Sequence, residues 1–256
     1  MVGAAAGGDG ERASLREALP LTSRANLVIA LLAVTILVDL IAAVVDFGQL
    51  SLLQGLRDGE RVTFAEATAS DDRVGTVGII QLVLLVITAI AFLLWYSRAY
   101  RNVIALGIRD PRYGTRWAVG SWFVPIVNLF RPKTVMNDIY RGSDPEMAYG
   151  DPSFASRPVD SLLHWWWGLW IGGNIVARFA ATSGDLESAT TIDRVINAAK
   201  AYVASDLIDA VAATLALLVV KKITDRAELR RYRMTGATEG GAAPPDAAPA
   251  LAPPST

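Results

Sequence analysis

The chain has 256 residues, of which 52% are hydrophobic and 19% are charged, whereas soluble domains contain roughly 25% charged residues. Its formal net charge of −1 gives no electrostatic signal for nucleic-acid binding. The lack of cysteine excludes disulfides and thiolate chemistry, and a single histidine argues against a histidine metal site or a Ser-His-Asp triad. We therefore expect a membrane protein that is not an enzyme, with no catalytic residue, metal, cofactor or nucleic-acid partner.

The two ends of the chain differ from the part between them. Residues 1–22 are small and of mixed charge, without the pattern of a signal peptide. Residues 234–256 are rich in alanine and proline and cannot bury enough apolar surface to fold. The sequence predicts a flexible N-terminus (1–22), one transmembrane domain (23–233) and a disordered C-terminal tail (234–256).

Four apolar runs are long enough to cross a bilayer, because about 20 apolar residues span its hydrocarbon core. They cover residues 26–45, 74–96, 162–182 and 198–220. The second run has no ionisable residue and ends in an aromatic pair, and three consecutive tryptophans follow His164 in the third run. Such rings lie at the headgroup layer. The predicted fold class is all-α, an integral membrane bundle of four transmembrane helices.

The charged residues between these runs predict the orientation. Lysine and arginine gather after the second and fourth runs, whereas the segments 46–73 and 183–194 are acidic. Basic loops stay on the cytoplasmic side of a bacterial inner membrane. We expect both termini and residues 97–161 to be cytoplasmic and the two acidic segments to be outside.

Residues 117–130 form an uncharged run that is too short to span the membrane. Pro125 removes a backbone donor, and Asn128 carries an amide that hydrocarbon cannot satisfy. A fifth crossing would also break the charge rule. The run is therefore predicted to be re-entrant or to lie in the cytoplasmic interface, between helices two and three. Arg131 and Lys133 follow it and either contact anionic headgroups or act as ordinary positive-inside anchors.

A stripe of residues continues the second helix beyond the membrane. Four of them recur at helical spacing: Trp95, Arg98, Asn102 and Leu106. Gly107 is the expected C-cap of this helix. We expect the stripe, through Arg98 and Asn102, to dock residues 117–130. The alternative is that both side chains contact only lipid phosphate and water.

The pattern WxxRxxxNxxxLG from Trp95 to Gly107, followed by RWAVGSWFVPIVNLFRPK, resembles a bacterial multi-pass membrane family known as domain of unknown function 4328. The resemblance covers residues 25–225. Its signature positions are Trp95, Arg98, Asn102, Gly107, Trp117, Trp122, Pro125, Asn128 and Pro132. It implies a multi-pass fold in the plasma membrane and carries no activity, cofactor or catalytic residue.

Polar residues inside the predicted spans are costly, at about 2.5–3.5 kcal/mol each near a helix centre unless they are paired. One group can converge in the outer half of the bilayer: Asp39, Asn174, Arg178, Asp206 and Asp209. Its excess of carboxylates suits a proton or cation site. A structural salt bridge from Arg178 to one aspartate is the other interpretation.

These features predict a non-enzymatic scaffold or accessory subunit, with the cytoplasmic aromatic and basic segment as its contact surface. Its partners would be the lipid bilayer and a membrane protein or a second copy of the chain. The alternative is a small transporter or channel component that handles protons or cations through the aspartate cluster. An intramembrane enzyme that uses these carboxylates as acid and base ranks third.

Overall fold

The computed structural model describes residues 3–108, 111–183 and 191–239. Within these residues the chain is helical and contains no strand, so the predicted all-α class is confirmed. The elements are α1 (Gly3–Glu17), α2 (Thr22–Arg57), α3 (Phe64–Ala105), α4 (Thr115–Gly120), η1 (Val127–Leu129), α5 (Arg131–Gly142), η2 (Pro152–Ser156), α6 (Ser161–Ser183) and α7 (Ile192–Glu239).

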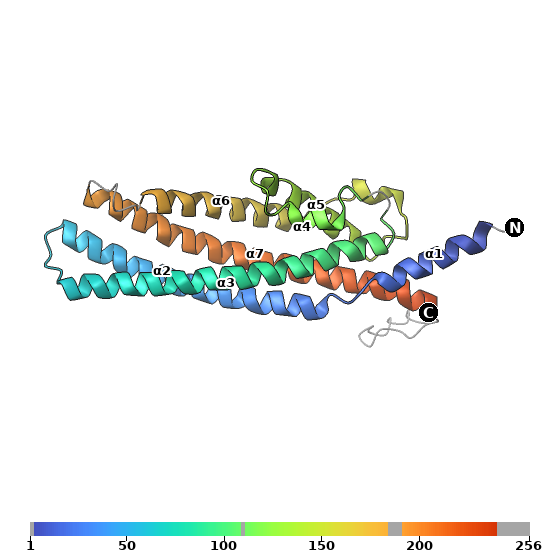
Figure 1. The fold of residues 1–256 in the computed structure, drawn as a ribbon, viewed down its shortest axis with the longest axis horizontal. Helices are drawn as coiled ribbons and strands as arrows, with labels where there is room; N and C mark the ends of the chain where they lie inside the picture. Colours follow the sequence, from blue (N-terminus) through green and yellow to red (C-terminus); the bar gives the residue numbers. More distant parts are fainter. Residues whose placement is uncertain (1–2, 109–110, 184–190, 240–256) are drawn as a thin grey trace, which may run out of the picture.

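Four long helices, α2, α3, α6 and α7, run along the longest axis of the molecule (Figure 1). Helix α7 packs against both α2 and α6, and α3 packs against α2. At one end, which we name the hairpin end, residues 58–63 connect α2 to α3 and α7 begins. At the opposite end, the terminal end, α2 begins, α3 and α7 finish, and α1, α4 and α5 lie against them (Figure 1).

Three helical stretches are long and apolar enough to cross a membrane: Gly10–Arg57, Phe64–Ala105 and Ile192–Gly236. They contain the first, second and fourth predicted spans, as expected for a membrane protein. The third predicted span, residues 162–182, coincides with α6, which is 23 residues long and is not one of the three.

Local sequence signals account for the bounds of α3. Thr63 and Glu66 form a capping box at its N-terminus, since each side chain bonds the backbone N–H of the other residue. The helix continues to Ala105, well beyond the predicted span, and Gly107 follows it with a φ of +93°. Glycine adopts this left-handed conformation without a Cβ penalty, so the predicted extension and C-cap are confirmed.

Both ends of the chain are more regular than their composition predicts. The predicted flexible segment 1–22 contains α1, and Leu15 of this helix packs with Ala18, just after it, against Leu106. The Ser14 hydroxyl donates to the Ala105 carbonyl over 2.8 Å. Helix α7 continues to Glu239, so the first residues of the predicted tail are helical, and residues 240–256 lie outside the described part of the chain.

Burial is uneven along α3. At the terminal end, Trp95 and Tyr96 are 0% exposed. Nearer the hairpin end, Ile79, Leu82 and Leu85 are 60% or more exposed, and few other side chains cover that part of the helix. The tightly packed core therefore lies at the terminal end, while the middle of α3 presents an apolar surface suited to lipid.

Candidate functional site

Residues 117–130, which we name the docked segment, are held on the bundle by aromatic rings. The Trp122 ring lies 5.6 to 5.8 Å from the rings of Phe92, Tyr96, Trp167 and Trp170, in edge-to-face geometry. Such pairs contribute about 0.5–1.5 kcal/mol each beyond their buried area. The full aromatic cluster consists of Phe92, Trp95, Tyr96, Trp122, Trp166, Trp167 and Trp170.

The polar ends of three aromatic side chains satisfy carbonyls in and around this segment. Trp167 of α6 donates its indole N–H to the Leu129 carbonyl over 3.1 Å. Tyr96 donates its hydroxyl to the carbonyl of the buried Pro132 over 3.3 Å. Tyr100 donates to the Tyr113 carbonyl over 2.9 Å. An irregular backbone is tolerated here because side chains of α3 and α6 replace its missing partners.

The predicted stripe on α3 does not perform this docking. Asn102 instead binds the backbone of Leu19, accepting its N–H over 3.1 Å and donating to its carbonyl over 2.6 Å. Trp95 donates its indole N–H to Thr224 of α7 over 3.0 Å. Arg98 is half-buried, and burial, followed by the charges of nearby arginines, lowers its pKa.

The face of α3 that contacts the docked segment is adjacent to the face of the predicted stripe. Phe92, Tyr96 and Tyr100 recur every four residues; the first two contact Trp122 of the docked segment, and Tyr100 binds Tyr113 just before it. The docking helix was therefore predicted correctly, and the choice of Asn102 was wrong, because its amide binds Leu19. The four-residue spacing of the aromatic residues on α3 is the sequence signal that identifies the correct face.

The outer side of the docked segment is apolar and strained. Phe123, Ile126 and Phe130 are 72%, 73% and 66% exposed. Ile126 has a φ of +66°, which is unfavourable for a β-branched residue and costs on the order of 1–3 kcal/mol. It follows the exposed Pro125, and Asn128 lies half-buried in η1. The segment thus holds a bent apolar tip away from the bundle.

The two basic residues after the segment have different surroundings. The Arg131 guanidinium lies over the rings of Tyr113 and Trp117, 5.1 and 5.3 Å from their centroids. Lys133 turns toward Asn137 and donates to its Oδ1 over 2.6 Å. Burial, followed by the charge of Arg141, lowers the pKa of Lys133 to about 8. Arg131 is therefore the better placed of the two for a headgroup.

The buried charge of Arg230 holds the terminal end together. Its guanidinium is completely buried and donates to the carbonyls of Gly142 (2.6 Å), Leu106 (2.7 Å), Met147 (3.2 Å) and Ala148 (3.4 Å). These carbonyls include the C-terminal ends of α3 and α5, where helices leave carbonyls without partners. Sequence reasoning treated Arg230 only as part of a basic segment, and nothing in its spacing distinguishes it from neighbouring arginines.

A second buried polar site lies between α2, α3 and α7. The side-chain amide of Gln81 donates to Asp39 Oδ1 and to Asp206 Oδ1, each over 3.1 Å. Asp39 is 5% exposed and Asp206 is 8% exposed. The second oxygen of each carboxyl group, Oδ2, is buried without a hydrogen-bond partner. Two charges about 6 Å apart repel by roughly 3 kcal/mol at an effective dielectric of 20, so this pair disfavours double ionisation.

The structure brings together part of the predicted polar cluster. Asp209 stays near both carboxyl groups, and its side chain lies against α6, since a Cβ on Gly173 would be 2.7 Å from Asp209 Oδ1. Asn174 is exposed and donates back to the Trp170 carbonyl, and Arg178 is exposed. Within the part of the chain that the structure describes, no group of three His, Cys, Asp or Glu residues is arranged to hold a metal ion.

Sequence reasoning left Gln81 out of the cluster, although it joins the two carboxyl groups. It is the polar residue of a span without ionisable groups, and it lies at the same predicted depth as Asp39 and Asp206. Matching polar residues by depth across spans, rather than collecting charged residues alone, would have identified it.

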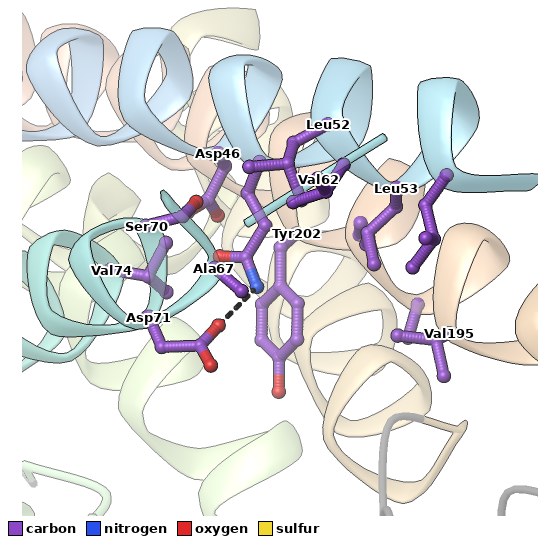
Figure 2. A pocket seen from close by; sticks show the side chains of 14 residues that line it. Asp46, Leu52, Leu53, Val62, Ala67, Ser70, Asp71, Val74, Val195 and Tyr202 are labelled. Carbon is purple, nitrogen blue, oxygen red and sulfur yellow. Dashed lines mark hydrogen bonds between the residues drawn. The ribbon is translucent and has the colours of Figure 1, made fainter. Parts of the chain in front are cut away.

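A cavity of about 300 Å³ opens at the hairpin end between α2, α3 and α7. Figure 2 shows Asp46, Ser70 and Asp71 on one side of Tyr202, with Leu53 and Val195 on the other. Asp46 is half-buried in this cavity and is also an electrostatic neighbour of Asp206. The cavity therefore leads from the hairpin end toward the carboxyl pair.

Three helical stretches that are long and apolar enough to cross a bilayer place the chain in the class of helical membrane proteins. The model of one family, described as domain of unknown function (DUF4328), matches residues 58–225. The chain belongs to this family, because the match covers more than half of its length. The match includes the docked segment, Gln81 and Asp206, whereas α2 with Asp39 and the residue Arg230 lie outside it. No curated protein and no solved structure matches the chain.

Proposed function

We propose that the protein crosses the bacterial inner membrane four times, with α2, α3, α6 and α7 as its spans and both termini in the cytoplasm. The terminal end is then cytoplasmic and the hairpin end lies outside. The basic segments after α3 and within the last part of α7 support this orientation. The contact of Asp39, Gln81 and Asp206 supports the alternating direction of α2, α3 and α7, because the predicted spans place all three residues at a similar depth.

In this orientation the docked segment lies in the cytoplasmic interface and does not cross the membrane. Its base is bound to the ends of α3 and α6 through Trp122, and its exposed tip carries Phe123, Ile126 and Phe130. Arg131 stands beside this tip with its charge over two aromatic rings, where it can contact an anionic headgroup.

The protein acts as a non-enzymatic scaffold or accessory subunit, and the docked segment is its contact surface. The observation that carries this proposal is a rigidly held, strained apolar tip, with Ile126 at a φ of +66° and 73% exposed. Backbone strain persists only where the surroundings impose it, and it concentrates at functional positions. A simple lipid anchor does not require a fixed, strained loop. The partner is a membrane protein or a second copy of the chain.

Single-cysteine crosslinking tests this proposal directly, because the native chain has no cysteine. A cysteine at Phe123 is expected to crosslink to protein in native membranes, and a second substitution, Ile126→Asp, is expected to abolish the product. A cysteine at the exposed Ser153 of η2 is the matched control and should give no such product. Equal crosslinking from both positions, or none from Phe123, contradicts the scaffold role.

A second candidate function is proton handling within the membrane, as a small transporter or channel component. The observation that favours it is the pair Asp39 and Asp206, which share one amide and leave both Oδ2 atoms unpartnered. Ionisable residues at such positions mark proton relays in membrane proteins. Proton flux into liposomes that falls in Asp39→Asn and Asp206→Asn variants supports this function, and unchanged flux removes it.

A further inference from the structure

The carboxyl pair and the cavity at the hairpin end are linked through Asp46. Asp46 lines the cavity and is an electrostatic neighbour of Asp206. Asp206 accepts a hydrogen bond from Gln81, and Gln81 donates another to Asp39. Tyr202, which also lines the cavity, precedes Asp206 by one helical turn on α7. The hydrogen bonds of Gln81 join α3 to α2 and α7, and Asp46 of α2 lies between this site and the cavity.

We propose that the cavity is the outward-facing entrance of a proton-binding site formed by Asp39, Gln81 and Asp206, with Asp46 as the group that passes the proton inward. This inference deepens the second proposed function and rests on it. It assigns the direction of access, the relay residue and the ligand, which is a proton delivered by water from outside the cell.

The chemistry of the path is a sequence of proton transfers between oxygen atoms. Hydronium in the cavity gives a proton to the Asp46 carboxylate and leaves water. Asp46 then passes the proton to Asp206, so that one O–H bond breaks as another forms and the Asp46 carboxylate is restored. The Gln81 amide holds both Oδ1 atoms and keeps the two Oδ2 atoms available to the proton.

The groups that face Asp206 come from each helix packed against this site. Helix α2 contributes Asp39 and Asp46, α3 contributes the neutral Gln81, and α7 itself contributes Asp209. Helix α6 approaches Asp209 with Gly173, which has no side chain. The site therefore combines several carboxyl groups with one amide, and a bound proton relieves the repulsion among them.

The path is closed in the opposite direction. Between the carboxyl pair and the terminal end, α3 buries Ala91 (5% exposed) and Trp95 (0% exposed). Beyond them lies the rest of the aromatic cluster, which packs the docked segment onto the bundle. The cavity at the hairpin end is therefore the open side of the site in this conformation.

The test measures protonated carboxyl groups by infrared spectroscopy of the purified full-length protein, using the C=O stretch of the neutral acid and its shift on transfer to D₂O. At neutral pH the wild-type protein is expected to show this band, and Asp39→Asn and Asp206→Asn are each expected to reduce it. Asp46→Asn should keep the band but slow its hydrogen–deuterium exchange on the order of 100-fold, the scale that positioned proton-transfer groups provide.

Filling the cavity is the second arm of the test. A cysteine at Val62, which lines the cavity, is modified with a bulky thiol reagent and is also expected to slow the exchange. A cysteine at Phe64, which is 88% exposed at the same end and does not line the cavity, is the matched control. If the band is present but neither Asp46→Asn nor the blocked cavity slows exchange, the cavity is not the entrance. The proton-binding site at Asp39 and Asp206 is then still supported. If the band does not depend on Asp39 or Asp206, the proton-handling function fails as well.

Discussion

Arg230 and the Asp39–Asp206 pair are both buried polar sites, and their hydrogen bonding differs. The Arg230 guanidinium is completely buried and donates to four backbone carbonyls at the terminal end. Although burial lowers the pKa of Arg230 to about 10, the group remains charged at neutral pH. The two aspartates share one amide and keep an unpartnered oxygen each.

This difference separates a structural role from a functional one. A buried polar group whose partners are complete contributes to a single rigid packing, and its removal leaves those partners without bonds. A buried group with incomplete partners costs stability, so its presence needs another reason. Arg230 at the terminal end is a group of the first kind, and the carboxyl pair near the hairpin end is of the second kind.

The largest expected effect comes from Arg230→Met. This substitution leaves carbonyls of α3 and α5 without donors, and each buried orphan costs about 1–3 kcal/mol. We expect a loss of about 3–5 kcal/mol in the free energy of unfolding, because several carbonyls lose their donor at once. The measurement is denaturation of the purified protein in detergent.

Arg233→Met is the matched control for this substitution. Arg233 is 47% exposed and forms an ion pair with Glu146 at the surface of the same helix. Exposed pairs contribute less than about 1 kcal/mol. If both variants unfold alike, the carbonyls around Arg230 do not depend on its guanidinium, and the structural half of the comparison is wrong.

The next effect tests whether the docked segment belongs to the rigid region. Trp122→Ala removes the ring that packs on Phe92, Tyr96 and Trp167, and we expect it to cost about 2–3 kcal/mol, less than a fully buried tryptophan. Cleavage by trypsin after Arg116 should accelerate in this variant. Phe123→Ala, at a ring that is 72% exposed, should change stability by less than about 0.5 kcal/mol.

The sequence predicts the helices of both regions well, because long apolar runs and end signals are local properties. The all-α class, the extension of α3 and the C-cap at Gly107 are confirmed. The face of α3 that docks residues 117–130 was predicted wrongly. The spacing of Arg98 and Asn102 is periodic, but the amide of Asn102 binds Leu19, between α1 and α2, whose position relative to α3 depends on the tertiary fold.

The partners of buried polar groups could not be predicted for the same reason. Arg230 is one of several basic residues in sequence, and only the three-dimensional path of the chain brings four carbonyls around it. Asp39 and Asp206 were expected to converge, and they do so through Gln81, which carries no charge. Asn174 and Arg178 share a helix face with each other, but this face is exposed.

At the carboxyl pair we expect a smaller effect, which is an increase rather than a loss in the free energy of unfolding. Asp206→Asn keeps an oxygen that accepts from Gln81 and removes the repulsion with Asp39 and Asp46. We expect the free energy of unfolding to rise by about 1 kcal/mol, the scale of one net polar interaction. The same denaturation experiment measures it. A loss as large as that of Arg230→Met would mean that the pair is structural and would remove the contrast between the two regions.

The smallest effect is a pH dependence at the terminal end, where the side chain of Lys133 is half-buried. Its pKa is lowered from the ordinary value of 10.5 to about 8, mainly because burial disfavours the charged form. Between these values the unfolded chain binds more protons than the folded one, so stability rises as pH increases from about 8 to 10.5. Below pH 8 the cost of the buried charge is fully present.

The substitution Lys133→Met removes the cost of burying the charge and the dependence of stability on pH that follows from it. The variant should be more stable than the wild type at pH 7, and the difference should shrink as pH rises toward 10.5, which thermal unfolding at a series of pH values measures. Lys221→Met, on an exposed position of α7, controls for the loss of a lysine. A difference that is constant with pH would show that Lys133 keeps its charge through the bond to Asn137. The terminal end would then contain no unsatisfied charge at this position, and its contrast with the carboxyl pair would be sharper.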